Sequence, residues 1–155
     1  MPAFPIRKIA KLTVVTTDEA AHYHVEDQIG FILRKANQRH VAIFAARISD
    51  LTPPQFAALS KLSDVGETSQ NQLGTLVAMD AATIKGVIDR LKARGLVEVT
   101  KHEGDKRRLM VRLTDTGRTT VADLTPLAEQ ITAETLAPLS PREAATLLRL
   151  LARIA

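Results

Sequence analysis

Apolar residues recur at helical spacing through residues 18–48, a stretch without proline in which Gly30 is the only glycine. They lie three or four positions apart: Val25, Ile29, Ile32, Leu33, Ala36, Val41, Phe44, Ala45 and Ile48. This spacing places them on one face of a helix. The pattern predicts one long helix, or two with a break near Gly30. Such a helix is typical of a dimerisation element, and the alternative is an ordinary core helix of a monomer.

Three shorter helices are predicted next, each from a capping residue that precedes an apolar stripe. Thr52, with Pro53 at the first helical position and Gln55 in the capping box, begins the first. Ser69 begins a short second helix and Asp80 begins a third. The stripes of the first and third helices are Phe56, Leu59 and Leu62, then Ile84, Val87, Ile88 and Leu91.

Two apolar runs with a charged tip between them follow a glycine stop at Gly95. The apolar residues are Leu96, Val97 and Val99 in the first run and Leu109, Val111 and Leu113 in the second. The tip carries Asp105, Lys106, Arg107 and Arg108. Helix, turn, helix and a two-stranded ribbon form the layout of a winged helix-turn-helix, which places one helix in the DNA major groove.

Thr114 can cap a helix after the ribbon, and residues 116–155 predict further helices. Pro126 lies inside the first of them and cannot donate a backbone hydrogen bond, so we expect a kink or break there. Ser140 and Glu143 form a capping box for the last helix. Its apolar stripe is Leu147, Leu148, Leu151 and Ile154.

The whole chain therefore predicts a single, mainly α domain with a small β-wing. It divides into an N-terminal arm (1–17), dimerisation helices (18–48 and 116–155) and a winged helix-turn-helix (51–115). Residues 1–17 contain two prolines, and we interpret them as an arm and not as a targeting segment. Lys11 interrupts the apolar part of this stretch, and no clear cleavage site follows.

Charge is concentrated on the predicted wing and the helix before it. Residues 83–118 hold ten Lys or Arg against five Asp or Glu. Because the whole chain has a net charge of +4, the other residues together carry a net charge of −1. A basic patch on a helix and ribbon is the electrostatic pattern of a DNA-binding protein.

Other classes of site are not indicated. The chain has no cysteine, which removes disulfides and thiolate metal ligands and suits a reducing cytoplasm. His22 and His24 lack a helical partner for metal binding, so we expect no metal and no cofactor. No nucleophile–base pair or Gly-rich phosphate loop stands out, so we expect no enzymatic activity. No apolar run approaches the roughly 20 residues of a membrane span, so we expect no membrane partner.

The ordered motifs of residues 51–117 resemble the multiple antibiotic resistance regulator (MarR) family. The matching segments are Leu51-Thr52-Pro53-Pro54-Gln55-Phe56, Ser69-Gln70 with Leu73, Val87-Ile88-Asp89-Arg90-Leu91, Gly95-Leu96-Val97, Asp105-Lys106-Arg107-Arg108, and Leu113-Thr114 with Gly117. The resemblance implies a homodimer that binds a pseudo-palindromic operator in double-stranded DNA and releases it when a small molecule binds. Residues 22–40 resemble the regulators of nicotinic acid breakdown, which implies a small aromatic carboxylate as effector.

The candidate DNA contacts begin at the two central helices. Ser69 and Gln70, at a helix N-terminus, are candidates for phosphate binding, and the alternative is that Ser69 only caps its helix. Ala81, Ala82, Thr83 and Lys85 are expected to face the groove, where Thr83 suits a base edge and Lys85 a guanine or phosphate. Because alanines offer few direct contacts, DNA shape is expected to contribute to specificity.

In the wing, Arg107 is the strongest candidate, since an arginine at a ribbon tip can enter the minor groove. Asp105 would repel phosphate, so we expect it to pair with a wing arginine and hold the loop. The remaining phosphate candidates are Arg90, Lys101, Lys106 and Arg108. The alternative is a solvated hairpin tip.

The resemblance implies an effector site between the long helices and the winged module. The candidate polar residues are Gln28, Asn37 and His40, and the candidate apolar walls are Phe31, Phe44 and Phe56. An aromatic acid needs a donor for its carboxylate and an apolar slot for its ring, and His40 is the candidate donor. The alternative is that these are ordinary packing or surface residues.

Three hypotheses of function follow from the sequence. The first is a dimeric repressor released by a ligand. The second is an architectural, nucleoid-type DNA-binding protein without an effector. The third is a winged helix used for protein–protein contact.

Overall fold

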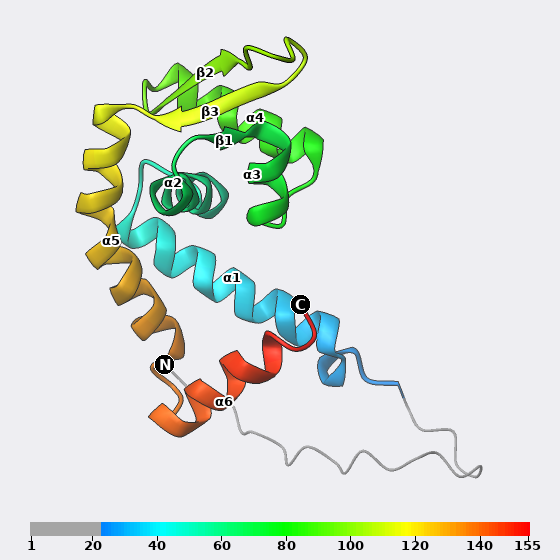
Figure 1. Ribbon diagram of the computed structural model, residues 1–155. Helices are drawn as coiled ribbons and strands as arrows, with labels where there is room; N and C mark the ends of the chain where they lie inside the picture. The colour runs from blue at the N-terminus through cyan, green and yellow to red at the C-terminus, as the bar shows by residue number, and fades with distance from the viewer. Residues whose placement is uncertain (1–22) are drawn as a thin grey trace.

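The computed structural model describes residues 23–155, so the expected arm (1–17) and the first residues of the 18–48 stretch lie outside the described part. Figure 1 shows the winged module (α2, α3, α4 and the sheet) at one end of the molecule and helix α6 at the other, with α1 and α5 between them.

The first long helix, α1 (Ile29–Arg47), begins later than the apolar pattern predicted. A 3₁₀ turn, η1 (Val25–Asp27), precedes it, and Gln28 between them has an extended backbone with φ −86° and ψ 135°. The Gln28 carbonyl accepts a hydrogen bond from the Ile32 N–H at 3.0 Å, which starts α1. The break therefore falls at Gln28, and Gly30 lies inside the helix.

Side-chain caps begin the three helices of the winged module, as the sequence predicts. The helices are α2 (Pro53–Val65), α3 (Gln70–Leu76) and α4 (Ala81–Ala93). Thr52 and Gln55 form both hydrogen bonds of a capping box, at 3.4 and 2.9 Å. The Asp80 carboxylate accepts from the Thr83 N–H at 2.7 Å, and the Ser69 hydroxyl caps α3. These contacts satisfy backbone donors that a helix N-terminus leaves free.

The wing belongs to a three-stranded antiparallel sheet of order β1-β3-β2. Its strands are β1 (Thr68–Ser69), β2 (Val97–Lys101) and β3 (Leu109–Leu113). Val97 pairs with Leu113, and Lys101 pairs with Leu109, so β2 and β3 form the predicted ribbon. The sequence did not predict β1, because two residues are too few to show an alternating pattern. Its pairing with β3 joins the wing to the start of α3.

Helix α5 (Asp115–Leu136) continues through Pro126 as one helix, so of the two predicted alternatives, a kink or a break, the break does not occur. Proline removes one hydrogen bond in a helix interior, but packing against neighbouring elements can outweigh that loss. Here α5 packs against α1, α2 and β3.

The last helix, α6 (Pro141–Leu151), begins at the predicted capping box. The Ser140 hydroxyl and backbone N–H donate to the Glu143 carboxylate at 2.7 and 2.8 Å. These two bonds, the hydroxyl contact first, hold the pKa of Glu143 below its ordinary value.

One continuous core joins the winged module to α1 and α5. Its largest fully buried side chains are Leu59, Leu62, Leu73, Ile84, Ile88, Leu91, Val111 and Ile131. All four residues of the predicted α4 stripe are buried, which confirms the prediction of which face of that helix points into the core. The predicted apolar stripe of α6, by contrast, is not part of the core, since Leu147, Leu148 and Ile154 are exposed.

A polar contact holds α1 against the C-terminal end of α5. Arg39 donates to the carbonyls of Thr135 and Glu134 at 2.7 and 3.1 Å. Arg47 forms an ion pair with the Glu134 carboxylate at 2.6 Å. Because the last carbonyls of a helix lack partners and carry partial negative charge, a guanidinium is a suitable group to bind them.

We expect Gly117→Ala to lower the free energy of unfolding by about 1–3 kcal/mol. A Cβ at residue 117 would lie 2.0 Å from the Leu96 carbonyl oxygen, and the backbone cannot yield easily there. The matched control is Gly86→Ala, where a Cβ would meet only the Arg90 guanidinium, at 3.7 Å. That change should stabilise α4 by up to about 1 kcal/mol. Urea denaturation measures both, and equal stabilities would contradict the contact between α5 and Leu96.

Candidate nucleic-acid interface

Helix α4 presents a face of small and polar residues away from the core. At about 100° per residue, Ala82, Gly86 and Asp89 lie opposite the buried stripe. Thr83, Lys85 and Arg90 lie at the borders of the same face and are exposed, as is Ala81 at its first turn. The centre of the face therefore lets another molecule approach the helix backbone closely, while longer side chains stand on both sides.

The start of α4 is fixed by Asp80, a residue that the sequence indicated only as a cap. The Thr83 backbone N–H, and then the Thr83 hydroxyl, hold the pKa of Asp80 below its ordinary value. Thr83 is thereby oriented before it meets any partner. Asp80 also places a negative charge at the N-terminus of α4.

Lys85 lies on α4 in an ion pair with Asp89, with 2.6 Å between its Nζ and the carboxylate. Both side chains are more than half exposed, at 64% and 59%. Exposed pairs of this kind contribute at most about 1 kcal/mol. Lys85 can therefore exchange Asp89 for a phosphate or a base edge at small cost.

The wing tip is held by backbone contacts that leave its basic side chains outside. The Asp105 carboxylate accepts from the Arg107 backbone N–H at 3.0 Å, and the Asp105 carbonyl accepts from the Arg108 N–H at 2.9 Å. The expected ion pair between Asp105 and an arginine is absent among the described contacts. Asp105 holds the loop through the main chain instead.

A small hollow of about 80 Å³ joins the wing to the start of α3. Its lining brings together the candidates Ser69, Gln70, Arg107 and Arg108, which are far apart in the sequence, and also includes Asn71 and Leu109. The pairing of β1 with β3 creates this proximity. The Ser69 hydroxyl accepts from the Gln72 N–H at 3.3 Å, so its proton can still be donated. A hydroxyl beside two guanidinium groups suits a phosphate oxygen.

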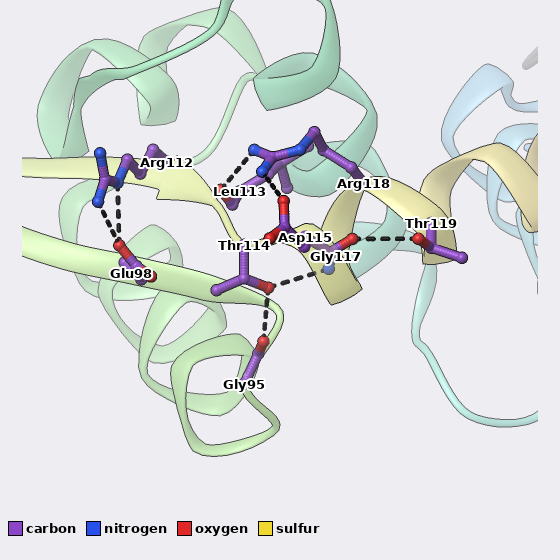
Figure 2. A network of polar contacts seen from close by, with 9 residues as sticks. All are labelled: Gly95, Glu98, Arg112, Leu113, Thr114, Asp115, Gly117, Arg118 and Thr119. Carbon is purple, nitrogen blue, oxygen red and sulfur yellow. Dashed lines mark hydrogen bonds and ion pairs between the residues drawn. The ribbon is translucent and has the colours of Figure 1, made fainter.

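Basic residues at the base of the wing are neutralised, whereas those near the tip are not. Figure 2 shows Arg112 bound to the Glu98 carboxylate, at 2.9 and 2.7 Å, and Arg118 bound to Asp115. The hydrogen bond and charge of Glu98 raise the pKa of Arg112. Within residues 23–155, no ion pair involves Arg90, Lys101, Lys106, Arg107 or Arg108. The uncompensated positive charge thus lies where a polyanion can reach it.

Thr114 ties the end of α4 to the start of α5. Its hydroxyl donates to the Gly95 carbonyl at 2.7 Å and accepts from the Gly117 N–H at 3.0 Å (Figure 2). Its backbone N–H donates to the Leu96 carbonyl at 3.1 Å. The sequence predicted only the capping of α5, since the second contact joins segments that are distant along the chain.

The six candidate effector residues do not line one cavity in the described structure. Gln28 donates to the His24 carbonyl, the Phe31 ring lies beneath Arg34 and Lys35, and Asn37 is exposed. Phe44 is buried, with its ring centroid 6.2 Å from that of Phe56, and His40 Nδ1 lies 3.0 Å from the Thr135 hydroxyl. Of the six, Phe56 lines a hollow of about 350 Å³ between α2 and α5.

A cavity that the sequence did not reveal lies where α1, α2, α4 and α5 meet. Its volume is about 270 Å³. Apolar side chains from three segments line it: Ile48, Leu51, Leu96 and Leu124. Its polar lining consists of Arg47, Ser49, Asp50, Arg94, Thr120 and Asp123. An apolar surface beside two guanidinium groups suits a small organic acid.

Metal and membrane sites find no support in residues 23–155. This part of the chain holds no group of three or more His, Cys, Asp or Glu side chains placed to bind a metal ion. None of its helices is both long and apolar enough to cross a membrane.

Comparison with known proteins identifies similar regulators. The profile described as MarR family matches residues 51–109. The chain is 41% identical over 134 residues to the HTH-type transcriptional repressor NicR of Pseudomonas putida, and the aligned part covers 85% of each protein.

Two solved structures are similar along most of the chain. A probable transcriptional regulator from Pseudomonas aeruginosa is 51% identical, with a TM-score of 0.81 and coverage of 85% of this chain and 100% of that one. BpsR of Bordetella bronchiseptica, whose DNA binding is regulated by 6-hydroxynicotinic acid, is 44% identical with a TM-score of 0.81. The aligned part covers 85% of this chain and 96% of BpsR. These comparisons confirm the mainly α fold with a small β-wing.

We expect Arg107→Ala to weaken binding to duplex DNA by about tenfold and to reduce the salt dependence by roughly one phosphate contact. Fluorescence anisotropy at several salt concentrations measures both quantities. Arg142→Ala is the control, because it removes the same charge from the first turn of α6. Full affinity of the Arg107 variant would contradict the role of the wing.

Proposed function

The chain belongs to the MarR family, and on this premise we propose that it is a homodimeric repressor that releases its operator when a small aromatic acid binds. The observation that supports DNA binding most strongly is the uncompensated positive charge of the wing tip, close to the start of α3 and on the same module as the exposed face of α4. This combination fits a helix in the major groove with a basic ribbon beside it.

In this proposal the whole chain is one domain with a division of roles. Residues 51–115 bind DNA, and residues 18–48 and 116–155 form the dimer. The DNA contacts are Ser69, Gln70, Ala81, Thr83, Lys85, Arg90, Lys101, Lys106, Arg107 and Arg108, with Asp105 holding the loop. Phosphate contacts from the wing position the protein, and α4 reads base edges and groove shape.

Exposed apolar residues at the end of the molecule that holds α6 support a second copy of this chain as the partner. Leu147, Leu148, Leu150 and Ile154 on and after α6 are 38% to 69% exposed, and Ile29 at the start of α1 is 59% exposed. Several of them line an apolar hollow of about 410 Å³. A contiguous apolar surface on a regulator is best explained as an interface. A twofold dimer would place two copies of α4 on successive turns of DNA.

A small aromatic carboxylate, of nicotinate type, is the proposed effector. BpsR, whose DNA binding responds to 6-hydroxynicotinic acid, and NicR, a repressor, are similar along 85% of this chain. The cavity lined by Arg47 and Arg94 offers the chemistry that such an acid needs, with apolar side chains for the ring and guanidinium groups for the carboxylate. The proposed location is the cytoplasm, and no cofactor or enzymatic activity is part of the proposal.

We expect the protein to shift a DNA fragment from upstream of its own gene at lower concentration than it shifts random DNA. Addition of 6-hydroxynicotinic acid or nicotinic acid should reverse the shift and raise the melting temperature of the free protein. An acetate control separates recognition of the ring from a salt effect. Equal affinity for random DNA, with no response to acids, would favour an architectural DNA-binding protein without an effector.

The dimer proposal predicts that Leu147→Glu, a change in the lining of the apolar hollow, produces a monomer with at least about tenfold weaker operator binding, because a charge would be buried at the interface. Ala145→Glu adds the same charge on the opposite face of α6 and should leave the dimer intact. Size-exclusion chromatography with light scattering measures the mass. A dimeric Leu147→Glu protein would contradict the proposed interface.

A further inference from the structure

Residues 94–96 follow α4, the helix proposed to lie in the major groove, and lead into the wing. They form hydrogen bonds with two different parts of the fold. Arg94 Nη1 donates to the Asp50 carbonyl in the connection between α1 and α2. On the other side, the carbonyls of Gly95 and Leu96 accept from Thr114 at the start of α5. The position of the C-terminal end of α4 therefore depends on both attachments.

The two attachments differ in how easily they can be broken. The Thr114 attachment has two hydrogen bonds and is supported by Gly117, whose Cα lies close against the Leu96 carbonyl. The attachment to Asp50 depends on one hydrogen bond between exposed residues. A competing acceptor would displace it first.

Arg94 and Asp50 both line the cavity of about 270 Å³ at the junction of α1, α2, α4 and α5. A carboxylate bound there would compete directly with the Asp50 carbonyl for the Arg94 guanidinium. A carboxylate carries a full negative charge and can accept two parallel hydrogen bonds from the guanidinium, whereas the neutral Asp50 carbonyl accepts one. The exchange therefore favours the ligand.

Arg47, the second guanidinium of the cavity, is less available for such an exchange. It donates to the Glu134 carboxylate at 2.8 Å and to the Gln130 side chain at 3.1 Å. These contacts attach it to the middle and end of α5. Arg94, whose only described side-chain partner is the neutral Asp50 carbonyl, is the exchangeable residue.

The wall of the cavity that α5 forms can recognise a second polar group on the ligand, besides its carboxylate. Asp123 lies on α5 with Thr120 one turn before it, and both line the cavity. The Asp123 carboxylate disfavours a dicarboxylate and accepts a hydrogen bond from a ring hydroxyl or ring N–H. The buried Leu51 and Leu96 provide the apolar surface for the ring.

We propose that Arg94 is the positioning residue through which the effector acts on the recognition helix. Its guanidinium exchanges the Asp50 carbonyl for the carboxylate of a planar aromatic acid that carries a ring donor. The exchange removes the hydrogen bond that joins the end of α4 to the connection between α1 and α2, while the Thr114 contacts to the start of α5 remain. This inference rests on the proposed function and specifies its regulation.

The test compares the full-length wild-type protein with Arg94→Met and Arg94→Lys. Operator affinity is measured with and without 6-hydroxynicotinic acid, and the ratio of the two dissociation constants is the coupling ratio. Calorimetry without DNA measures binding of the acid itself. Arg149→Met, on the exposed surface of α6, is the control for loss of one arginine.

We expect a wild-type coupling ratio of about tenfold or more. In Arg94→Met the ratio should fall to near one, with operator affinity already reduced in the absence of acid. Arg94→Lys keeps a donor for the Asp50 carbonyl but cannot bind a carboxylate in the planar bidentate geometry. It should retain operator affinity and lose most of the response, which a merely structural role of Arg94 would not produce.

The outcomes separate the two levels of the proposal. A wild-type protein that binds operator but does not respond to the acid overturns the ligand response and this inference with it. A responsive wild-type protein whose Arg94 variants keep the same coupling ratio overturns the role of Arg94 alone. If Arg94→Met fails to fold, an unchanged ratio in Arg94→Lys is sufficient to overturn that role.

Discussion

The burial of one stripe of α4 is the constraint on which the rest of the molecule depends. Ile84, Val87, Ile88 and Leu91 are at most 4% exposed. Burial of each such side chain contributes about 1.5–3 kcal/mol, whereas the ion pair on the opposite face contributes at most about 1 kcal/mol. The core therefore sets the rotation of the helix, and the residues that remain outside determine what it can recognise. Helices α2 and α3 and strand β2 pack directly against that helix.

The charged residues of the module fall into two groups with different roles. Arg112 and Arg118 have acidic partners and stabilise the place where the ribbon joins α5. Lys106, Arg107 and Arg108 have none among the described ion pairs, because Asp105 is occupied with the backbone of the loop. A rigid base and an open, positively charged tip let the wing reach a phosphate backbone without losing its shape.

The sequence predicted those parts of the fold that depend on neighbouring residues. Caps at Thr52, Asp80 and Thr114, and the alternation of β2 and β3, are local signals, and the structure confirms them. The break at Pro126 was wrong because packing around α5, which no local pattern reports, outweighs the lost hydrogen bond. The cavity at Arg94 was not foreseen because its walls come from three segments that only the tertiary fold brings together. The candidate DNA contacts were predictable only in part. Ser69 and Arg107 could each be recognised in the sequence, but their proximity depends on the short strand β1, which the sequence did not predict.

The open space above Gly86 has a consequence for how related regulators can diverge. A Cβ introduced there would lie in the middle of the exposed face of α4 and would meet only the Arg90 guanidinium, at 3.7 Å. Folding therefore places little restriction on the identity of that residue. A single codon change could supply a new base contact without repacking the core, so a duplicated gene could acquire a different target site while keeping its dimer and its sensor.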